Sequence, residues 1–96
     1  MKLKLDLHTH CQEATQFAPP DEKTVGRIVE MALKRGLDGL AITDHDALEY
    51  ARRIKEVAER SFGSSLIIIP GREIRVGDNH VVELYLDSDA VFRFIA

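Results

Sequence analysis

Two short apolar runs, at residues 39–43 (GLAIT) and 66–69 (LIII), constrain the fold more than any other feature. Strands that read as continuous apolar runs are buried on both faces, and they occur mainly in parallel sheets covered by helices. A chain with such strands must therefore supply the helices that cover them. We predict an α/β protein with a mostly parallel sheet.

The covering helices are indicated by apolar residues that recur at helical spacing. One helix is predicted from Asp21 to Arg35, with Asp21 as its N-cap and Gly36 after a basic last turn. A second helix is predicted between Asp46, a candidate N-cap, and Gly63. Strands and helices therefore alternate along this part of the chain.

The N-terminal segment alternates between charged residues and leucines over residues 2–7, which is the period of a β-strand. We expect Leu3, Leu5 and Leu7 to form the face that packs against the helices. Residues 11–20 show no periodicity, so they predict a loop.

The C-terminal part predicts two further strands. The strand that begins at the second apolar run is predicted to end at Pro70–Gly71. A turn at residues 77–79 (GDN) then precedes a strand over residues 81–86, as in a hairpin. The order β-α-β-α-β-β implies right-handed crossovers and places functional sites at the carboxyl ends of the strands.

The composition fits one soluble domain of 96 residues, of which 45% are apolar. There are 13 basic and 16 acidic residues, and no basic block favours a nucleic-acid or membrane surface. The one cysteine, Cys11, cannot form an internal disulfide, and no apolar run approaches the ~20 residues that span a bilayer. Because the N-terminus lacks the apolar core of a signal peptide, we expect a cytoplasmic protein.

Four histidines and a glutamate fall at or just beyond the ends of predicted strands. His8 and His10 are two positions apart on one strand, so they project from the same face, roughly 7 Å apart at Cα. His45, Glu73 and His80 follow other strands. Since the carboxyl ends of parallel strands meet at one edge of a sheet, we expect these side chains to converge.

Such a group of imidazoles with one carboxylate suits zinc, manganese or iron, and a carboxylate can bridge two ions. Two other interpretations stay open. His8 and His10 are also compatible with histidines that only form hydrogen bonds. Glu73 and His80 are also compatible with solvated turn residues.

Four segments carry these residues: DLHTH (6–10), AITDHD (41–46), PGREI (70–74) and GDNHVV (77–82). In order and spacing they resemble the first motifs of the PHP (polymerase and histidinol phosphatase) superfamily. The resemblance implies the N-terminal part of a distorted, TIM-like (β/α)7 barrel with up to three divalent metal ions at its C-terminal mouth. It also implies hydrolysis of a phosphate monoester or small nucleotide by metal-activated water.

The resemblance further implies a role for each ligand. His8 and His10 would hold the first metal ion, and Glu73 would bridge the first and second. His80 would bind the second ion, and His45 would belong to the third.

Other residues near the motifs receive weaker assignments. Asp6 and Asp44 are candidates for orienting the imidazoles or for capping the strand ends, and Asp44 is also a candidate catalytic residue. Arg72 is the second candidate catalytic residue, because it flanks a ligand and a guanidinium binds phosphate. Glu13 is the nearest candidate for a further ligand of the third metal, whereas Cys11 is interpreted as a bystander.

The later motifs of the superfamily have no counterpart in these 96 residues, so we expect a single, truncated PHP-type domain over residues 1–96. Two alternatives to a phosphoesterase stay open: a catalytically incomplete half-barrel that binds metal or a partner, and an enzyme acting on a non-phosphate substrate. We expect a small phosphorylated substrate and a homo-oligomer that covers open strand edges and an apolar C-terminal segment. That segment comprises Val91, Phe92, Phe94, Ile95 and Ala96.

Overall fold

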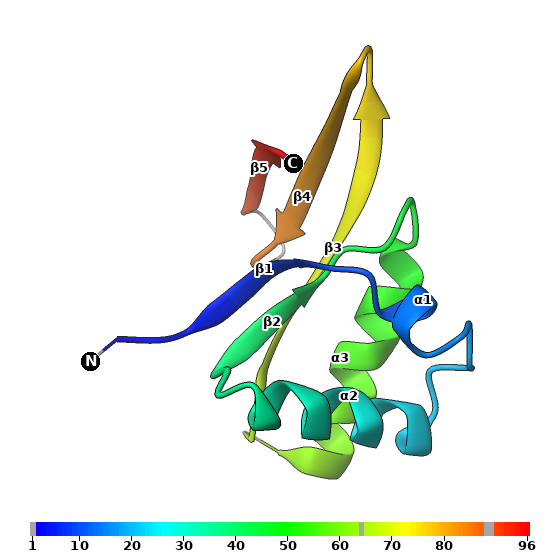
Figure 1. The fold of residues 1–96 in the computed structure, drawn as a ribbon, viewed down its shortest axis with the longest axis vertical. Helices are drawn as coiled ribbons and strands as arrows, with labels where there is room; N and C mark the ends of the chain where they lie inside the picture. The colour runs from blue at the N-terminus through cyan, green and yellow to red at the C-terminus, as the bar shows by residue number, and fades with distance from the viewer. Residues whose placement is uncertain (1, 64, 88–89) are drawn as a thin grey trace.

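A computed structural model describes residues 2–63, 65–87 and 90–96 and has an α/β architecture (Figure 1). Five strands form one curled sheet in the order β1-β2-β3-β4-β5, and helices α2 and α3 cover one of its faces. In chain order the elements are β1 (Leu5–Thr9), α1 (Cys11–Ala14), α2 (Glu22–Lys34), β2 (Gly39–Ile42), α3 (Leu48–Phe62), β3 (Ile67–Val76), β4 (Asn79–Tyr85) and β5 (Val91–Ile95). None of the helices in the described ranges is long and apolar enough to cross a membrane.

The first long helix, α2, confirms the prediction made from capping signals. The side chain of Asp21 accepts a hydrogen bond from the backbone N–H of Thr24 (2.9 Å), as an N-cap should. Gly36 follows the helix with a φ of 73°, a left-handed conformation that favours glycine. Local residues therefore define both ends of this helix.

The second long helix, α3, begins one residue later than predicted, at Leu48. Asp46 is not its N-cap: it has a φ of 48° and lies outside the helix. The backbone N–H of Asp46 donates to the carbonyl of Glu73 (2.9 Å), and its carboxylate accepts from Arg72 (3.3 Å). Contacts with β3 thus override the local capping signal.

The sheet separates two apolar clusters. The larger one lies between the sheet and helices α2 and α3, and it includes Leu40 and Ile42 of β2. The smaller one lies on the opposite face, where Ala41 contacts Val82 and Leu84. Strand β2 is buried on both faces, as its apolar sequence predicts.

The predicted orientation of the N-terminal leucines is wrong. Leu5 pairs with Gly39 and Asp6 pairs with Leu40, so it is Asp6 that shares the helix-covered face with Leu40. Leu5 and Leu7 lie on the opposite face and remain 37% and 38% exposed. Alternation predicted the strand, but it carries no information about which side the helices cover.

Strand β3 does not end at Pro70–Gly71 but continues through it to Val76. Its first part pairs in parallel with β2, and its second part pairs antiparallel with β4. Gly71 permits this close packing, because an added Cβ would lie 2.3 Å from the carbonyl oxygen of Glu83. The sheet is therefore mixed rather than mostly parallel, since β4 and β5 also pair antiparallel.

The remaining elements are the β3–β4 hairpin, strand β5 and the short helix α1. The β3–β4 hairpin is confirmed, with Gly77 at a φ of 62° in its turn. Strand β5 was not predicted, because its residues read only as an apolar ending. Helix α1 lies inside the predicted loop, where the carboxylate of Asp44 accepts the backbone N–H groups of Cys11 (3.2 Å) and Gln12 (2.8 Å).

Candidate metal centre

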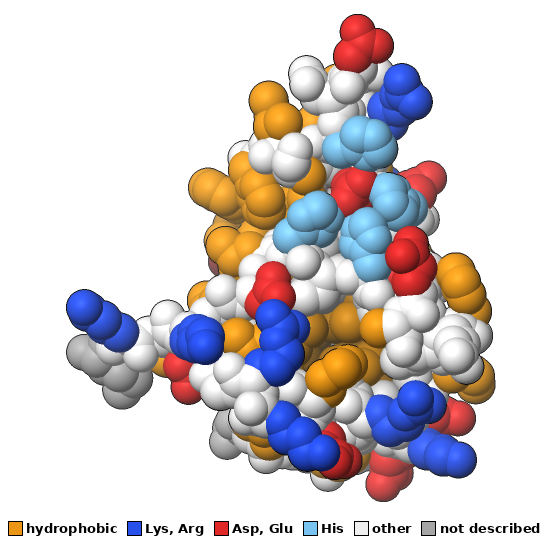
Figure 2. Space-filling view, in the orientation of Figure 1, with side chains coloured by type: hydrophobic (Ala, Val, Ile, Leu, Met, Phe, Trp, Pro, Cys, Tyr) orange, Lys and Arg blue, Asp and Glu red, His pale blue; other side chains and the backbone are white. Residues whose placement is uncertain are grey.

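Four elements bring the histidines and Glu73 to one edge of the sheet. His8 and His10 lie at the end of β1, and His45 lies in the loop between β2 and α3. Glu73 lies in β3, and His80 lies at the start of the antiparallel strand β4. Figure 2 shows the histidine side chains gathered in one patch around an acidic side chain.

Glu73 lies at the centre of this patch, with only 5% of its surface exposed. Its Oε1 contacts Nε2 of His8 (2.5 Å) and Nε2 of His10 (3.0 Å). Its Oε2 contacts Nδ1 of His80 (2.8 Å) and Nδ1 of His45 (3.3 Å). Each carboxylate oxygen therefore faces a different pair of imidazoles.

The protonation of Glu73 follows from these contacts. Burial raises the pKa of its carboxyl, but the hydrogen bonds with His8, His80 and His10 outweigh this effect and hold the pKa at about 2. Glu73 is therefore a carboxylate at neutral pH, which is the form that binds a cation.

The donor atoms are close enough to share metal ions. Three sets of nitrogen and oxygen donors lie within 4.8 Å of one another, namely His8, His10 and Glu73, then His10, Glu13 and His45, and then His45, Glu73 and His80. Ligand bonds of about 2.0–2.2 Å in tetrahedral geometry place neighbouring donors roughly 3–4 Å apart. The spacing and the chemistry of these residues therefore fit divalent metal ions.

Glu13 and Cys11 flank His10 in different ways. The carboxylate of Glu13 lies 3.6 Å from Nδ1 of His10 and its side chain is 62% exposed. The thiol of Cys11 is buried, and burial raises its pKa to about 11. A neutral thiol of this kind is a poor metal ligand, whereas Glu13 is placed where it can reach an ion next to His10.

The acidic residues of the motifs contact backbone groups. Asp44 is buried and caps α1 through the N–H groups of Cys11 and Gln12. Asp6 accepts the backbone N–H of His8 (3.2 Å) and pairs with Arg35 (3.2 Å). Neither carboxylate caps a strand end: Asp44 binds the first turn of α1 and Asp6 binds within β1, so they position the chain on either side of the histidines.

Arg72 lies beside Glu73 in sequence but on the other face of β3. Its guanidinium contacts the buried carboxylate of Glu83 (2.7 Å) and that of Asp46 (3.3 Å). Arg75 is two residues beyond Glu73, so it shares the face of Glu73 and pairs with His80 across the hairpin. Sequence reasoning missed Arg75, although its even spacing from Glu73 was visible.

Sequence reasoning also missed two threonines that connect β1 and β2. The hydroxyl of Thr43 accepts the backbone N–H of Thr9 (3.0 Å) and donates to the carbonyl of Thr9 (3.1 Å). The hydroxyl of Thr9 donates to the carbonyl of Ala41 (2.5 Å). A signal was available in the sequence, because Thr9 lies between His8 and His10 and Thr43 lies two residues before His45.

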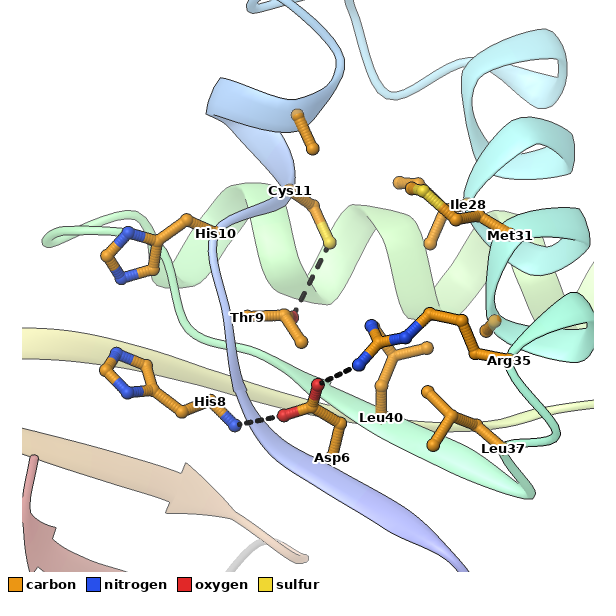
Figure 3. A pocket seen from close by; sticks show the side chains of 12 residues that line it. Asp6, His8, Thr9, His10, Cys11, Ile28, Met31, Arg35, Leu37 and Leu40 are labelled. Carbon is orange, nitrogen blue, oxygen red and sulfur yellow. Dashed lines mark hydrogen bonds and ion pairs between the residues drawn. The ribbon is translucent and has the colours of Figure 1, made fainter.

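A groove lies next to the histidine patch, and His8 and His10 are among the residues that line it (Figure 3). This groove has a volume of about 290 Å³ and lies between β1 and α2. Asp6, Thr9 and Cys11 point toward α2, whereas the rings of His8 and His10 lie on the other side of the β1 backbone. The side chains change sides where the register between β1 and β2 shifts, between Asp6 and Thr9.

Comparisons with known proteins show a similarity in sequence to a protein of unknown activity. No family model matches the chain. It is 29% identical over 93 residues to an uncharacterized protein of Methanocaldococcus jannaschii, a match that covers 93% of this chain and 53% of that protein. The chain therefore spans about half the length of this curated relative.

A comparison of structures gives a neighbour with a named chemistry. The chain is similar to a solved structure from Bifidobacterium adolescentis, a "putative metal-dependent phosphoesterase", with a TM-score of 0.56 and 26% sequence identity. The similarity covers 88% of this chain and 28% of that protein. Nearly all of this chain thus corresponds to a minor part of the larger structure.

Proposed function

We propose that this chain binds divalent metal ions at Glu73 and the surrounding histidines and hydrolyses a phosphate monoester or small nucleotide. We further propose that it is a PHP-type domain whose sheet corresponds to the first strands of a distorted (β/α)7 barrel. The observation that carries both proposals is the placement of Glu73, whose two oxygens each face a separate pair of imidazoles. The phosphoesterase neighbour supports the choice of reaction.

The ligands divide naturally into three sets around shared residues. His8 and His10 would hold one ion with Oε1 of Glu73, and His80 would hold a second with Oε2. A third ion would use His45, with Glu13 as an added carboxylate. Zinc, manganese and iron all accept this mixture of nitrogen and oxygen donors.

The chemistry combines the cations with the fixed geometry of the chain. A bound divalent ion lowers the pKa of coordinated water and neutralises charge on phosphate oxygens. Glu73 contributes a carboxylate that stays ionised at neutral pH, which is the form that binds a cation. The surrounding imidazoles are partly exposed, so a phosphate group would approach the site from their side.

The experiment that tests this function measures metal content and turnover together. Purified protein should contain zinc, manganese or iron, and it should hydrolyse p-nitrophenyl phosphate or a small nucleotide when manganese is added. His8→Ala and His10→Ala should each lose bound metal and activity while keeping the far-ultraviolet circular dichroism of the wild type. Equal metal content in the wild type and both variants would contradict the proposed site.

A metal-binding module without turnover is the second candidate. The match to only 53% of the curated relative favours keeping it, because residues outside the matched region can contribute to an active site. Bound metal without hydrolysis of either substrate would support the module and reject the phosphoesterase.

A further inference from the structure

We propose that Thr43 is a positioning residue that fixes the geometry of the metal centre through its side-chain hydroxyl. This inference rests on the proposed metal-binding function. Thr43 is fully buried and follows β2 directly. Its neighbours in space are the backbone groups that carry the candidate ligands.

The first observation is that Thr43 binds both backbone groups of Thr9. Its hydroxyl accepts the N–H of Thr9 (3.0 Å) and donates to its carbonyl (3.1 Å). The backbone N–H of Thr43 donates to the same carbonyl (2.9 Å). Thr9 is the residue between His8 and His10, so this contact fixes the peptide units from which both imidazoles project.

The second observation is the irregular pairing at this point. The register between β1 and β2 shifts between Asp6 and Thr9, and a regular ladder therefore does not hold this segment. The hydroxyl of Thr43 supplies the missing hydrogen-bond partner. Without it, the direction of His8 and His10 would depend on a locally disrupted strand.

The third observation connects this segment to Glu73. The residue after Thr43, Asp44, accepts the backbone N–H of Glu73 through its own carbonyl (3.0 Å). The side chain of Asp44 accepts the N–H groups of Cys11 and Gln12, just beyond His10. Residues 43–44 therefore hold the histidine segment at a fixed separation from the carboxylate that faces it.

Outer residues that orient ligands commonly change metal affinity by about 10- to 100-fold when they are substituted. Thr43→Val keeps the shape of the side chain and removes only the hydroxyl. Thr43→Ser keeps the hydroxyl and removes the methyl group, which lies 3.1 Å from the position of an added Cβ on Gly71. The two variants thus separate the hydrogen bonds from the packing.

The test titrates metal-free protein with Co²⁺ and records the dissociation constant by calorimetry and the ligand-field absorption spectrum. Thr43→Val should raise the dissociation constant about 10- to 100-fold and change the spectrum, whereas Thr43→Ser should restore both. Thr24→Val is the matched control, because Thr24 is also buried but lies on α2. The Co²⁺ affinity and the absorption spectrum of Thr24→Val should equal those of the wild type.

The results for the variants test the role of the Thr43 hydroxyl, and the result for the wild type tests the metal centre itself. Wild-type affinity in Thr43→Val, or equal losses in the valine and serine variants, would overturn the role of the hydroxyl. Failure of the wild type to bind Co²⁺ would instead reject the proposed metal centre. If Thr43→Val does not fold, Thr43→Ser and Thr43→Ala provide the same comparison, since these two differ only in the hydroxyl.

Discussion

At the scale of single residues, Glu73 determines the character of the candidate site. A buried carboxylate is costly unless other groups compensate its charge. Four imidazoles surround Glu73, and hydrogen bonds with three of them hold its pKa well below the ordinary value despite its burial. A site built around such a carboxylate favours the binding of cations. Substitutions of Glu73 and of the residues near it should therefore have different effects on metal and phosphate binding.

Glu73→Gln should reduce metal binding more than Glu13→Gln does. A bridging carboxylate serves two ions. Its loss should therefore lower metal affinity by more than the roughly 100-fold that is typical of residues that only orient the ligands. Glu13 is largely exposed, and its carboxylate lies 3.6 Å from Nδ1 of His10. Metal content measured by mass spectrometry after dialysis provides the comparison, and a larger loss from Glu13→Gln would place the cluster elsewhere.

Arg75 should contribute to phosphate binding more than Arg72 does. Arg72 is engaged by Glu83 and Asp46 on the opposite face of β3, although the sequence favoured it as the phosphate contact. Arg75 faces the side of His80, and among the residues that the structure describes it forms a hydrogen bond to Gly77 but no ion pair. Its guanidinium is thus available to a phosphate group.

We therefore expect Arg75→Gln to raise KM for p-nitrophenyl phosphate about tenfold or more, which corresponds to one charge-assisted hydrogen bond. Arg75→Lys should retain part of the binding, because it keeps the charge. Arg72→Gln is the matched comparison. It should lower the free energy of unfolding, and it should raise KM less than Arg75→Gln does. A larger KM effect in Arg72→Gln would restore the assignment suggested by the sequence.

At the scale of secondary-structure elements, a row of charges connects the three C-terminal strands. Glu83 of β4 lies between Arg72 of β3 and Arg93 of β5, with guanidinium contacts of 2.7 and 2.5 Å. Tyr85 adds a hydrogen bond to the same carboxylate (2.9 Å). Because Glu83 is buried, these bonds stabilise the pairing of β3, β4 and β5.

Glu83 should make the stability of the protein depend on pH in the acid range. Burial raises the pKa of Glu83, but the hydrogen bonds from Arg93, Arg72 and Tyr85 outweigh it and lower the pKa from 4.5 to about 2. Since the folded-state pKa is depressed, the stabilisation is complete above the unfolded pKa and is lost as pH falls toward 2.

Glu83→Gln should accordingly lower the free energy of unfolding by about 3 kcal/mol at pH 7 and by less at pH 3. Urea denaturation at both pH values measures this difference. Glu56→Gln is a suitable control, because Glu56 is exposed and its surface ion pairs with Arg53 and Arg60 contribute little. An equal effect of Glu83→Gln at both pH values would show that its charge does not stabilise the sheet.

At the scale of the whole molecule, the curled sheet leaves apolar side chains uncovered on the face opposite the helices. Leu5 and Leu7 lie on this face at β1, and Phe92 lies on it at β5, where it pairs with Leu84. All three are exposed, and Phe92 is 52% exposed. Exposed apolar groups beside open strand edges favour association with another polypeptide.

We expect the isolated chain to self-associate, with a dimer as the simplest state. Phe92→Ser should shift the equilibrium toward monomer, because it removes apolar area from this face. Phe17→Ser should not, because Phe17 is 70% exposed but lies in the loop after α1. Light scattering over a concentration series measures both, and a monomer at every concentration would contradict the expectation.

The sequence determined the features that depend on neighbouring residues. The helix from Asp21 to Arg35 follows from its own capping residues, and β2 follows from its apolar run, because both signals lie within a few positions. The order of elements predicted that His8, His10 and His45 converge, whereas Glu73 lies within β3 and His80 lies at the start of the antiparallel strand β4. The spacing of His8 and His10 correctly placed both at the end of the first strand.

Tertiary structure decided the features that depend on distant partners. Asp46 adopts a left-handed conformation because β3 binds it, and α1 forms where Asp44 caps a segment 32 positions away. The direction of Leu5 depends on which face the helices cover, and the direction of His8 depends on an irregularity in pairing with β2. No local pattern specifies such contacts, because their energy is gained only when separate strands meet.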